Sequence, residues 1–176
     1  EGNDITHAPV DERARKGIFY AFQNPVSIHG VSVAKLLREL LGADKVAAKQ
    51  LLPDLKKYAK EYQFKEELLT RGIHDGFSGG EKKKIEMIQA QYLAKKYALF
   101  DEIDTGLDID ALKKVAREIN SLKKRGIGCL VITHFARLTE YLDIDRIFVM
   151  QKGRLVRIGG KSIIREIEKK GYGHFT

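Results

Sequence analysis

One strand–helix–strand pattern in the second half of the chain constrains its fold more than any other feature. Residues 97–100 form a short, continuous apolar run, as expected for a strand buried on both faces of a parallel sheet, and residues 129–133 repeat it. Between them lies a helical pattern that stops at Gly126. Its apolar positions are Leu112, Val115, Ala116, Ile119 and Leu122. The pattern predicts a right-handed βαβ unit, and hence an α/β fold with a mostly parallel sheet.

Polar side chains follow both predicted strands. Asp101 and Glu102 come directly after the first strand, and His134 ends the second. We expect all three at one edge of the sheet, where the carboxyl ends of parallel strands meet and ligands bind. A carboxylate at this place is costly unless a cation or hydrogen-bond donors satisfy it. Because neighbouring residues of a strand point in different directions, Asp101 and Glu102 can play two different roles.

The chain divides into two parts by its patterns. Residues 18–22 read as a further strand that stops at Gln23, and the segment from residue 31 to residue 96 reads as almost wholly helical. Within it, we expect one helix up to Pro53 and another after that residue. We therefore predict an α/β core formed by residues 1–30 and 97–176, with a helical subdomain, residues 31–96, inserted between them.

A second candidate site lies where the last predicted helix of the insert begins. Ser78 can cap this helix, and Glu81, three residues later, can close a capping box. Gly79 and Gly80 have no Cβ, so an anion can approach the backbone N–H groups at the positive end of the helix dipole. The stretch therefore predicts an anion site as well as a cap.

Composition excludes several classes of protein. The formal net charge is +8, but the basic residues alternate with acidic ones over several predicted helices, which favours solvated helix faces over a nucleic-acid surface. No apolar run approaches the roughly 20 residues that cross a bilayer, so we expect a soluble protein without direct membrane insertion. A single cysteine, Cys129, cannot form an internal disulfide, which fits a cytoplasmic setting.

Five motifs in order resemble the nucleotide-binding domain of ABC ATPases. They are "FQNP" as the Q-loop, then "FSGGE", "ALFDE", "GLD" and a strand ending in histidine. Four longer stretches are similar in sequence to the SufC ATPases of the SUF iron–sulfur cluster assembly system. They are "DERARKGIFYAFQNPV", "GFSGGEKKKIEM", "DEIDTGLDIDAL" and "GYGHFT". The resemblance runs over nearly the whole chain. It implies an ABC-ATPase core of the P-loop NTPase type.

The resemblance also implies cofactors and roles. ATP and Mg²⁺ are the implied cofactors, with Asp101 and Gln23 as the metal-binding residues. Glu102 matches the residue that polarises the attacking water, and His134 matches the one that contacts the γ-phosphate and positions the water.

Further matches are implied at a dimer interface. Ser78, Gly79, Gly80 and Glu81 match the signature motif that meets ATP held by a second copy, and Asp108 matches the loop that communicates across the dimer. The implied protein partners are SufB- and SufD-like scaffold subunits, docked near Gln23 and the helical subdomain.

One expected motif is missing. The phosphate loop G-x-x-x-x-G-K-[ST] should precede Gln23, and no such loop is found there. Residues 153–162 contain Gly-Lys-Ser, but Leu155 stands where the leading glycine belongs, so we read this stretch as a hairpin followed by a helix capped by Ser162. We expect the N-terminal part of the domain, including the loop, to lie upstream. The chain alone is then expected to be inactive.

Three alternatives stay open on the sequence. The first is the ATPase subunit of a membrane ABC transporter. The second is a non-catalytic interaction fragment, because half a site cannot transfer a phosphoryl group unaided. The third is an ABC-like DNA-repair ATPase, which the basic charge permits but which normally carries a long coiled coil that this sequence lacks.

Overall fold

A parallel sheet of three strands forms the centre of the molecule. The computed structural model describes residues 2–42 and 45–175. The strands β1 (Ile18–Ala21), β4 (Tyr97–Asp101) and β5 (Gly128–Ile132) pair in the order β1-β4-β5. Helix α5 (Ile109–Lys124) connects β4 to β5, so the predicted βαβ unit is confirmed.

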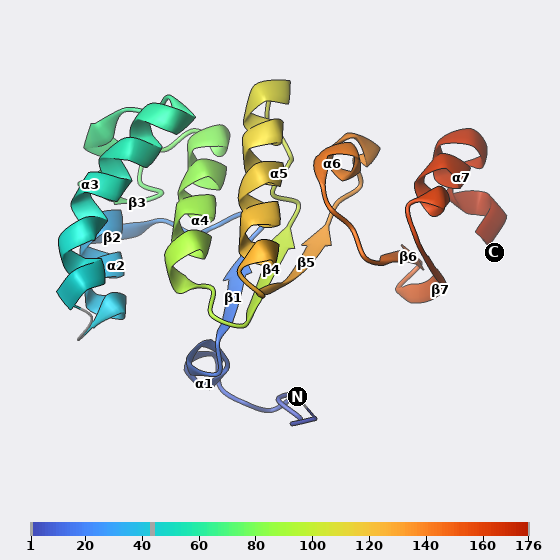
Figure 1. Cartoon of the computed structure of the whole chain (residues 1–176), viewed down its shortest axis with the longest axis horizontal. Helices are drawn as coiled ribbons and strands as arrows, with labels where there is room; N and C mark the ends of the chain where they lie inside the picture. Colours follow the sequence, from blue (N-terminus) through green and yellow to red (C-terminus); the bar gives the residue numbers. More distant parts are fainter. Residues whose placement is uncertain (1, 43–44, 176) are drawn as a thin grey trace.

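The two faces of this sheet differ. Helices α4 (Gly79–Leu93) and α5 lie side by side on one face (Figure 1). On that face Phe19, Ala98 and Phe100 are buried in the main hydrophobic cluster. The other face, called the open face below, carries Tyr20, Tyr97, Leu130 and Ile132, all of them exposed. The expectation of strands buried on both faces is therefore wrong for the described residues, because both helices pack on the same side.

The helical part has a hydrophobic cluster of its own. Helix α2 (Val33–Leu41) begins at Ser32, whose hydroxyl accepts a hydrogen bond from Lys35 N at 3.2 Å. Helix α3 (Lys45–Tyr62) continues through Pro53, so the predicted break there is wrong. Burial of Leu51 and Leu55 on either side of the proline explains the continuity, because packing of this face outweighs one lost backbone hydrogen bond.

Two smaller features depart from the predicted all-helical segment. Strands β2 (Ile28–Ser32) and β3 (Gly72–Ile73) form a short antiparallel ladder that no alternating pattern indicated. The segment after α3 forms only one 3₁₀ turn, η1 (Glu66–Leu69). The predicted helix that runs up to Pro53 is described from Lys45 onward.

Helix α4 belongs to both clusters. Its residues Met87 and Ala90 join the cluster under the sheet, whereas Ile85 and Ile88 join the helical cluster. Leu93 packs against both. Because α4 packs against both clusters, its apolar residues lie around the helix instead of on one side only. The division of the chain at residues 30/31 and 96/97 stays a prediction.

The C-terminal elements extend to one side of the sheet. Helix α1 (Val10–Arg15) precedes β1, while α6 (Ala136–Tyr141), the hairpin β6 (Ile147–Gln151) and β7 (Arg154–Gly159), α7 (Ser162–Lys170) and η2 (Tyr172–Phe175) follow β5 (Figure 1). The predicted hairpin and closing helix are confirmed, but Lys161, not Ser162, occupies the N-cap of α7. The Gly-Lys-Ser stretch thus follows a hairpin strand.

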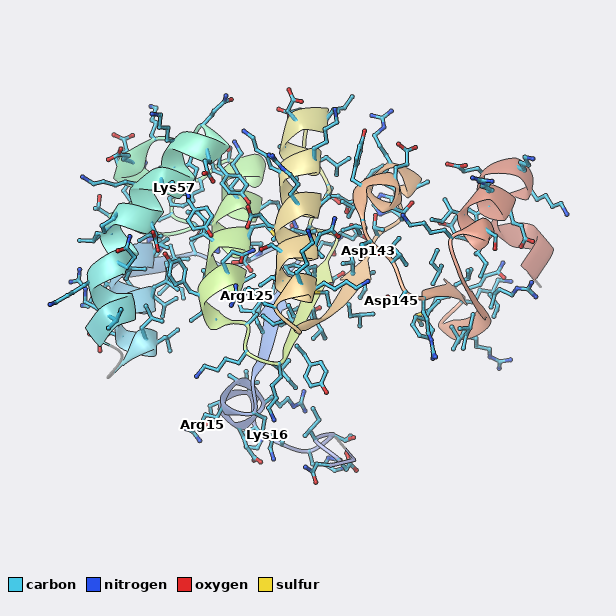
Figure 2. The ribbon with its side chains drawn as sticks, in the orientation of Figure 1. Arg15, Lys16, Lys57, Arg125, Asp143 and Asp145 are labelled. Carbon is cyan, nitrogen blue, oxygen red and sulfur yellow. The ribbon has the colours of Figure 1, made fainter. Side chains whose placement is uncertain are left out.

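Charged side chains attach the segment after α6 to α5. Figure 2 shows Asp143 and Asp145 on this segment, and Lys123 Nζ lies 3.2 Å from a carboxylate oxygen of Asp143 and 2.8 Å from one of Asp145. Within residues 2–42 and 45–175, none of the helices is long and apolar enough to cross a membrane.

Candidate active site

Three predicted site residues meet beyond the carboxyl ends of β4 and β5. Gln23 Nε2 donates a hydrogen bond to Glu102 Oε2 at 2.6 Å. His134 Nδ1 lies 3.3 Å from Glu102 Oε1. The backbone N–H of Glu102 donates to Ile132 O at 2.9 Å, which fixes the start of one strand-end loop against the neighbouring strand. The structure thus brings Gln23, Glu102 and His134 together around one carboxylate.

The backbone at Glu102 is strained. Its φ is +47°, in the left-handed region that side chains with a Cβ rarely adopt. This turn directs the carboxylate toward Gln23 and His134, while Thr105 Oγ1 lies 3.4 Å from Glu102 Oε2. Strain of this kind persists only where the surroundings hold it, and it is common at functional sites.

Asp101 has different surroundings from Glu102. It ends β4 on the open face, where its Oδ2 accepts a hydrogen bond from the Tyr20 hydroxyl at 2.8 Å. The carboxylate raises the pKa of Tyr20, mainly through this hydrogen bond. Among the described residues, nothing donates to the second oxygen of Asp101 or to the side-chain oxygen of Gln23, so both can take an added ligand. Hard oxygen donors of this type suit Mg²⁺.

This donor set is sparse. Among the described residues, no group of three or more His, Cys, Asp and Glu side chains is placed to hold a metal ion. One carboxylate and one amide oxygen agree with the usual mode of Mg²⁺ binding, in which phosphate oxygens and waters complete the shell.

The predicted capping box at the start of α4 is confirmed. Ser78 Oγ accepts from Glu81 N at 3.3 Å, and Glu81 Oε2 accepts from Ser78 N at 2.8 Å and from Ser78 Oγ at 2.7 Å. These hydrogen bonds lower the pKa of the Glu81 carboxyl. A Cβ built on Gly79 would meet nothing within 4 Å in the described structure, so packing does not require glycine there. The open space leaves the backbone N–H groups accessible to a ligand.

Asp108 caps the next helix. Its Oδ1 accepts a hydrogen bond from Ala111 N at 2.7 Å, at the first turn of α5. A Cβ on Gly80 would lie 4.0 Å from Leu107 Cδ2, so the loop before Asp108 approaches the start of α4. No hydrogen bond or ion pair within the described part of the chain joins Ser78 or Gly79 to Glu102 or His134.

Relatives of the chain decide its family. It is 41% identical over 177 residues to vegetative protein 296 of Bacillus subtilis, covering 98% of this chain and 68% of the relative. A probable ABC transporter ATP-binding protein of Streptococcus pyogenes is 40% identical, with 98% and 69% covered, and a probable ATP-dependent transporter of Antithamnion sp. is 41% identical, with 100% and 73% covered. The chain belongs to the family of ABC ATP-binding cassette ATPases. No protein-family model matches it.

Solved structures show the same cassette fold. An ATP-binding subunit of an ABC transporter superposes with a TM-score of 0.74 at 24% identity, over 94% of this chain and 71% of that one. A dimeric ATP-binding cassette in a post-hydrolysis state, bound to ADP and Pi, superposes with a TM-score of 0.67 at 18% identity, over 87% and 68%. The chain is therefore an α/β ABC-ATPase nucleotide-binding domain that spans part of the length of such cassettes.

The cassette has a buried lysine that the sequence did not reveal. The charge pattern predicts a solvated place for Lys83, yet this residue is buried, and its Nζ donates to Gln23 O at 2.7 Å. Burial lowers the pKa of Lys83, while nearby carboxylates, including Glu86, Asp101 and Glu102, act in the opposite direction. Helical spacing could have predicted the burial of Lys83, because this residue shares a helical face with the buried residues Met87 and Ala90.

A second buried polar group ties the segment after Gln23 to α4. Ser27 Oγ donates to His74 O at 2.9 Å, and His74 Nε2 lies 2.9 Å from Glu86 Oε1 on α4. Both His74 and Glu86 are buried, and Gln89 Nε2 donates to the same oxygen of Glu86 at 3.0 Å. The Gln23 segment and the start of α4 are thus connected at two places, through Lys83 and through His74.

Proposed function

We propose that the complete protein is an ATPase subunit that hydrolyses ATP at a composite site, with Mg²⁺ as the metal cofactor. One observation carries the proposal: Glu102, held in a strained turn at the carboxyl edge of the sheet, with Gln23 and His134 on its two oxygens. A carboxylate with this backbone geometry is expensive to maintain and has acid–base chemistry available to it.

The proposed mechanism assigns one role to each member of the cluster. Glu102 accepts a proton from the attacking water, and Gln23 holds the carboxylate in place through its amide. His134, more than half exposed, donates toward the γ-phosphate and orients the water. Bound Mg²⁺, held by Asp101 and Gln23, would neutralise charge on the phosphate oxygens.

A second copy of the protein completes the proposed site. Ser78, Gly79 and Gly80 lie open at the start of α4, and we assign them to the γ-phosphate of ATP bound to the other copy. Glu81 supports them through the capping box, and Asp108 fixes the loop that faces the dimer partner.

The substitution Glu102→Gln tests the reaction. In the complete protein, it should leave ATP affinity within a few-fold of wild type and slow steady-state hydrolysis by a factor on the order of 10² or more. Asp101→Asn should weaken Mg²⁺-ATP binding instead. Glu140→Gln, at an exposed place on α6, is the matched control and should turn over at the wild-type rate. Unchanged turnover in both site variants would refute the assignment of this strand end.

Two biological settings fit the cassette. The sequence of its motifs favours a SufC-type subunit that powers iron–sulfur cluster assembly on SufB- and SufD-like scaffolds. The names of the transporter relatives favour a second candidate, the ATPase subunit of a membrane ABC transporter. Affinity purification from the source cells distinguishes them, since soluble scaffold subunits support the first setting and membrane-embedded subunits support the second.

We assign partner docking to the segment that follows Gln23. Val26 and Ile28 are apolar and exposed there, with Val26 at 78%, and Phe22, directly before Gln23, is exposed as well. Ser27 contacts His74, and His74 contacts α4, the helix that begins with the signature motif. A partner bound to this segment can therefore shift the position of that motif. Val26→Asp with Ile28→Asp should abolish co-purification of partners, whereas Leu40→Asp, exposed on α2, should not. Retained partners in the double variant would refute this surface.

A further inference from the structure

A buried carboxylate lies two residues beyond Glu102 and has no part in the mechanism described so far. Asp104 is only 4% exposed. Its Oδ2 accepts a hydrogen bond from Thr133 Oγ1 at 2.6 Å. Its Oδ1 is buried and has no partner in the described structure. A buried, half-satisfied carboxylate is unfavourable for folding, so its presence calls for another explanation.

Thr133 links this carboxylate to the turn that carries His134. The Thr133 hydroxyl donates its proton to Asp104 and accepts a hydrogen bond from Phe135 N at 2.9 Å. His134 is the residue between Thr133 and Phe135, so its backbone is enclosed by this chain of hydrogen bonds. The loop after β4 and the loop after β5 are therefore joined by the hydrogen bond between Asp104 and Thr133, in addition to the contact between Glu102 and His134.

The His134 side chain depends on such support. Its ring is 54% exposed, and its polar contact in the described structure is the one to Glu102 at 3.3 Å. The Phe135 ring, at 4.0 Å between centroids, is itself exposed and cannot fix the imidazole. The place of the imidazole opposite Glu102 therefore also depends on where the backbone of the turn holds His134.

We infer that Asp104, acting through the Thr133 hydroxyl, is a positioning residue that holds His134 opposite Glu102. The inference rests on the proposed function, which gives Glu102 and His134 their roles. Asp104 touches no reacting group. Because the Thr133 hydroxyl donates its proton to Asp104, its oxygen is left to accept from Phe135 N, so the carboxylate fixes the donor and acceptor directions of the hydroxyl.

Amide hydrogen exchange, measured by NMR on the complete protein, tests the link without ATP. In Asp104→Ala and in Thr133→Val, the Phe135 amide should exchange at least about tenfold faster than in wild type. Asp104→Asn and Thr133→Ser keep an acceptor and a hydroxyl, so they should stay near wild type. The amide of Gly128, bonded to Lys96 O at the other end of β5, controls for global destabilisation. Unchanged Phe135 exchange in Asp104→Ala would overturn the inference.

Steady-state kinetics then separate positioning from stability. Thr133→Val should lower kcat about tenfold with KM for ATP within about twofold, because the ground-state contacts are kept, and Thr133→Ser should restore the rate. Glu140→Gln, exposed on α6, is the control. A wild-type kcat in Thr133→Val, alongside a reduced kcat in Glu102→Gln, would overturn the inference and leave the proposed function intact. A wild-type protein without ATPase activity would refute the proposed function, and the exchange data would still decide whether Asp104 fixes the turn.

Discussion

The two faces of the central sheet are made of the same kinds of residue and have opposite surroundings. Phe100 and Ala98 lie under α4 and α5 and are almost completely buried. Leu130 and Ile132, equally apolar, are about half exposed on the open face. An apolar strand residue therefore stabilises the fold only where another element covers it. The exposed residues that surround Asp101 on the open face are available to further parts of the cassette.

The largest expected effect comes from matched truncations on the two faces. Phe100→Ala on the covered face should lower the free energy of unfolding by about 3–5 kcal/mol, because it removes a buried ring and leaves a cavity. Leu130→Ala on the open face should cost under about 1 kcal/mol, since the side chain keeps much of its contact with water. Urea unfolding of both variants measures the difference. Equal losses would show that the open face is covered in solution.

A smaller effect is expected in the helix layer of the covered face. Burial, followed by the nearby Glu61, raises the pKa of Glu118 on α5 above its ordinary value of 4.5, and Lys57, labelled in Figure 2, acts in the opposite direction. The ionised carboxylate therefore disfavours folding at neutral pH. Glu118→Gln should stabilise the protein at pH 7, and the gain should disappear as the pH falls through the raised pKa toward 4.5.

Thermal unfolding at several pH values checks the sign of this effect. Glu140→Gln, on an exposed face of α6, is the control and should stay within about 0.5 kcal/mol of wild type at pH 7. A gain that persisted below pH 4 would contradict the explanation, because Glu118 is then protonated in both the folded and the unfolded state.

The smallest effect on stability is expected from charges on the open face. Leu130→Lys combined with Ile132→Lys should change the free energy of unfolding by no more than about 1 kcal/mol, since both positions are half exposed. The same variant should aggregate less on heating, because it divides an exposed apolar patch. Light scattering during a thermal ramp measures this. A collapse in stability comparable to that of Phe100→Ala would show that the two faces are equally buried.

Local patterns predicted much of the fold and much of the site. Helical spacing from Leu112 to Leu122 located α5, and the apolar runs beside it located β4 and β5. The rule that parallel strands end at one edge predicted Asp101, Glu102 and His134 there, whereas the place of Gln23 beside Glu102 was implied only by the family resemblance. These predictions depend on short-range periodicity and on topology, which the order of residues encodes directly.

What escaped prediction depends on packing between distant segments. Nothing local to residues 97–100 indicates that one face lacks a covering helix. Pro53 lies inside α3 because residues on both sides of it pack into the helical cluster. Asp104 and Thr133 lie 29 positions apart in sequence, and their hydrogen bond appears only when two loops meet.

The left-handed backbone at Glu102 means that folding stability and ATP turnover favour different residues at this position. Glycine adopts a φ of +47° without strain, so Glu102→Gly should be more stable than Glu102→Ala by about 0.5–1 kcal/mol. A library of variants at this position, selected only for survival after heating, should become enriched in glycine. Selected for ATP turnover, the same library should return to glutamate. The residue preferred at position 102 thus depends on whether folding stability or turnover is selected.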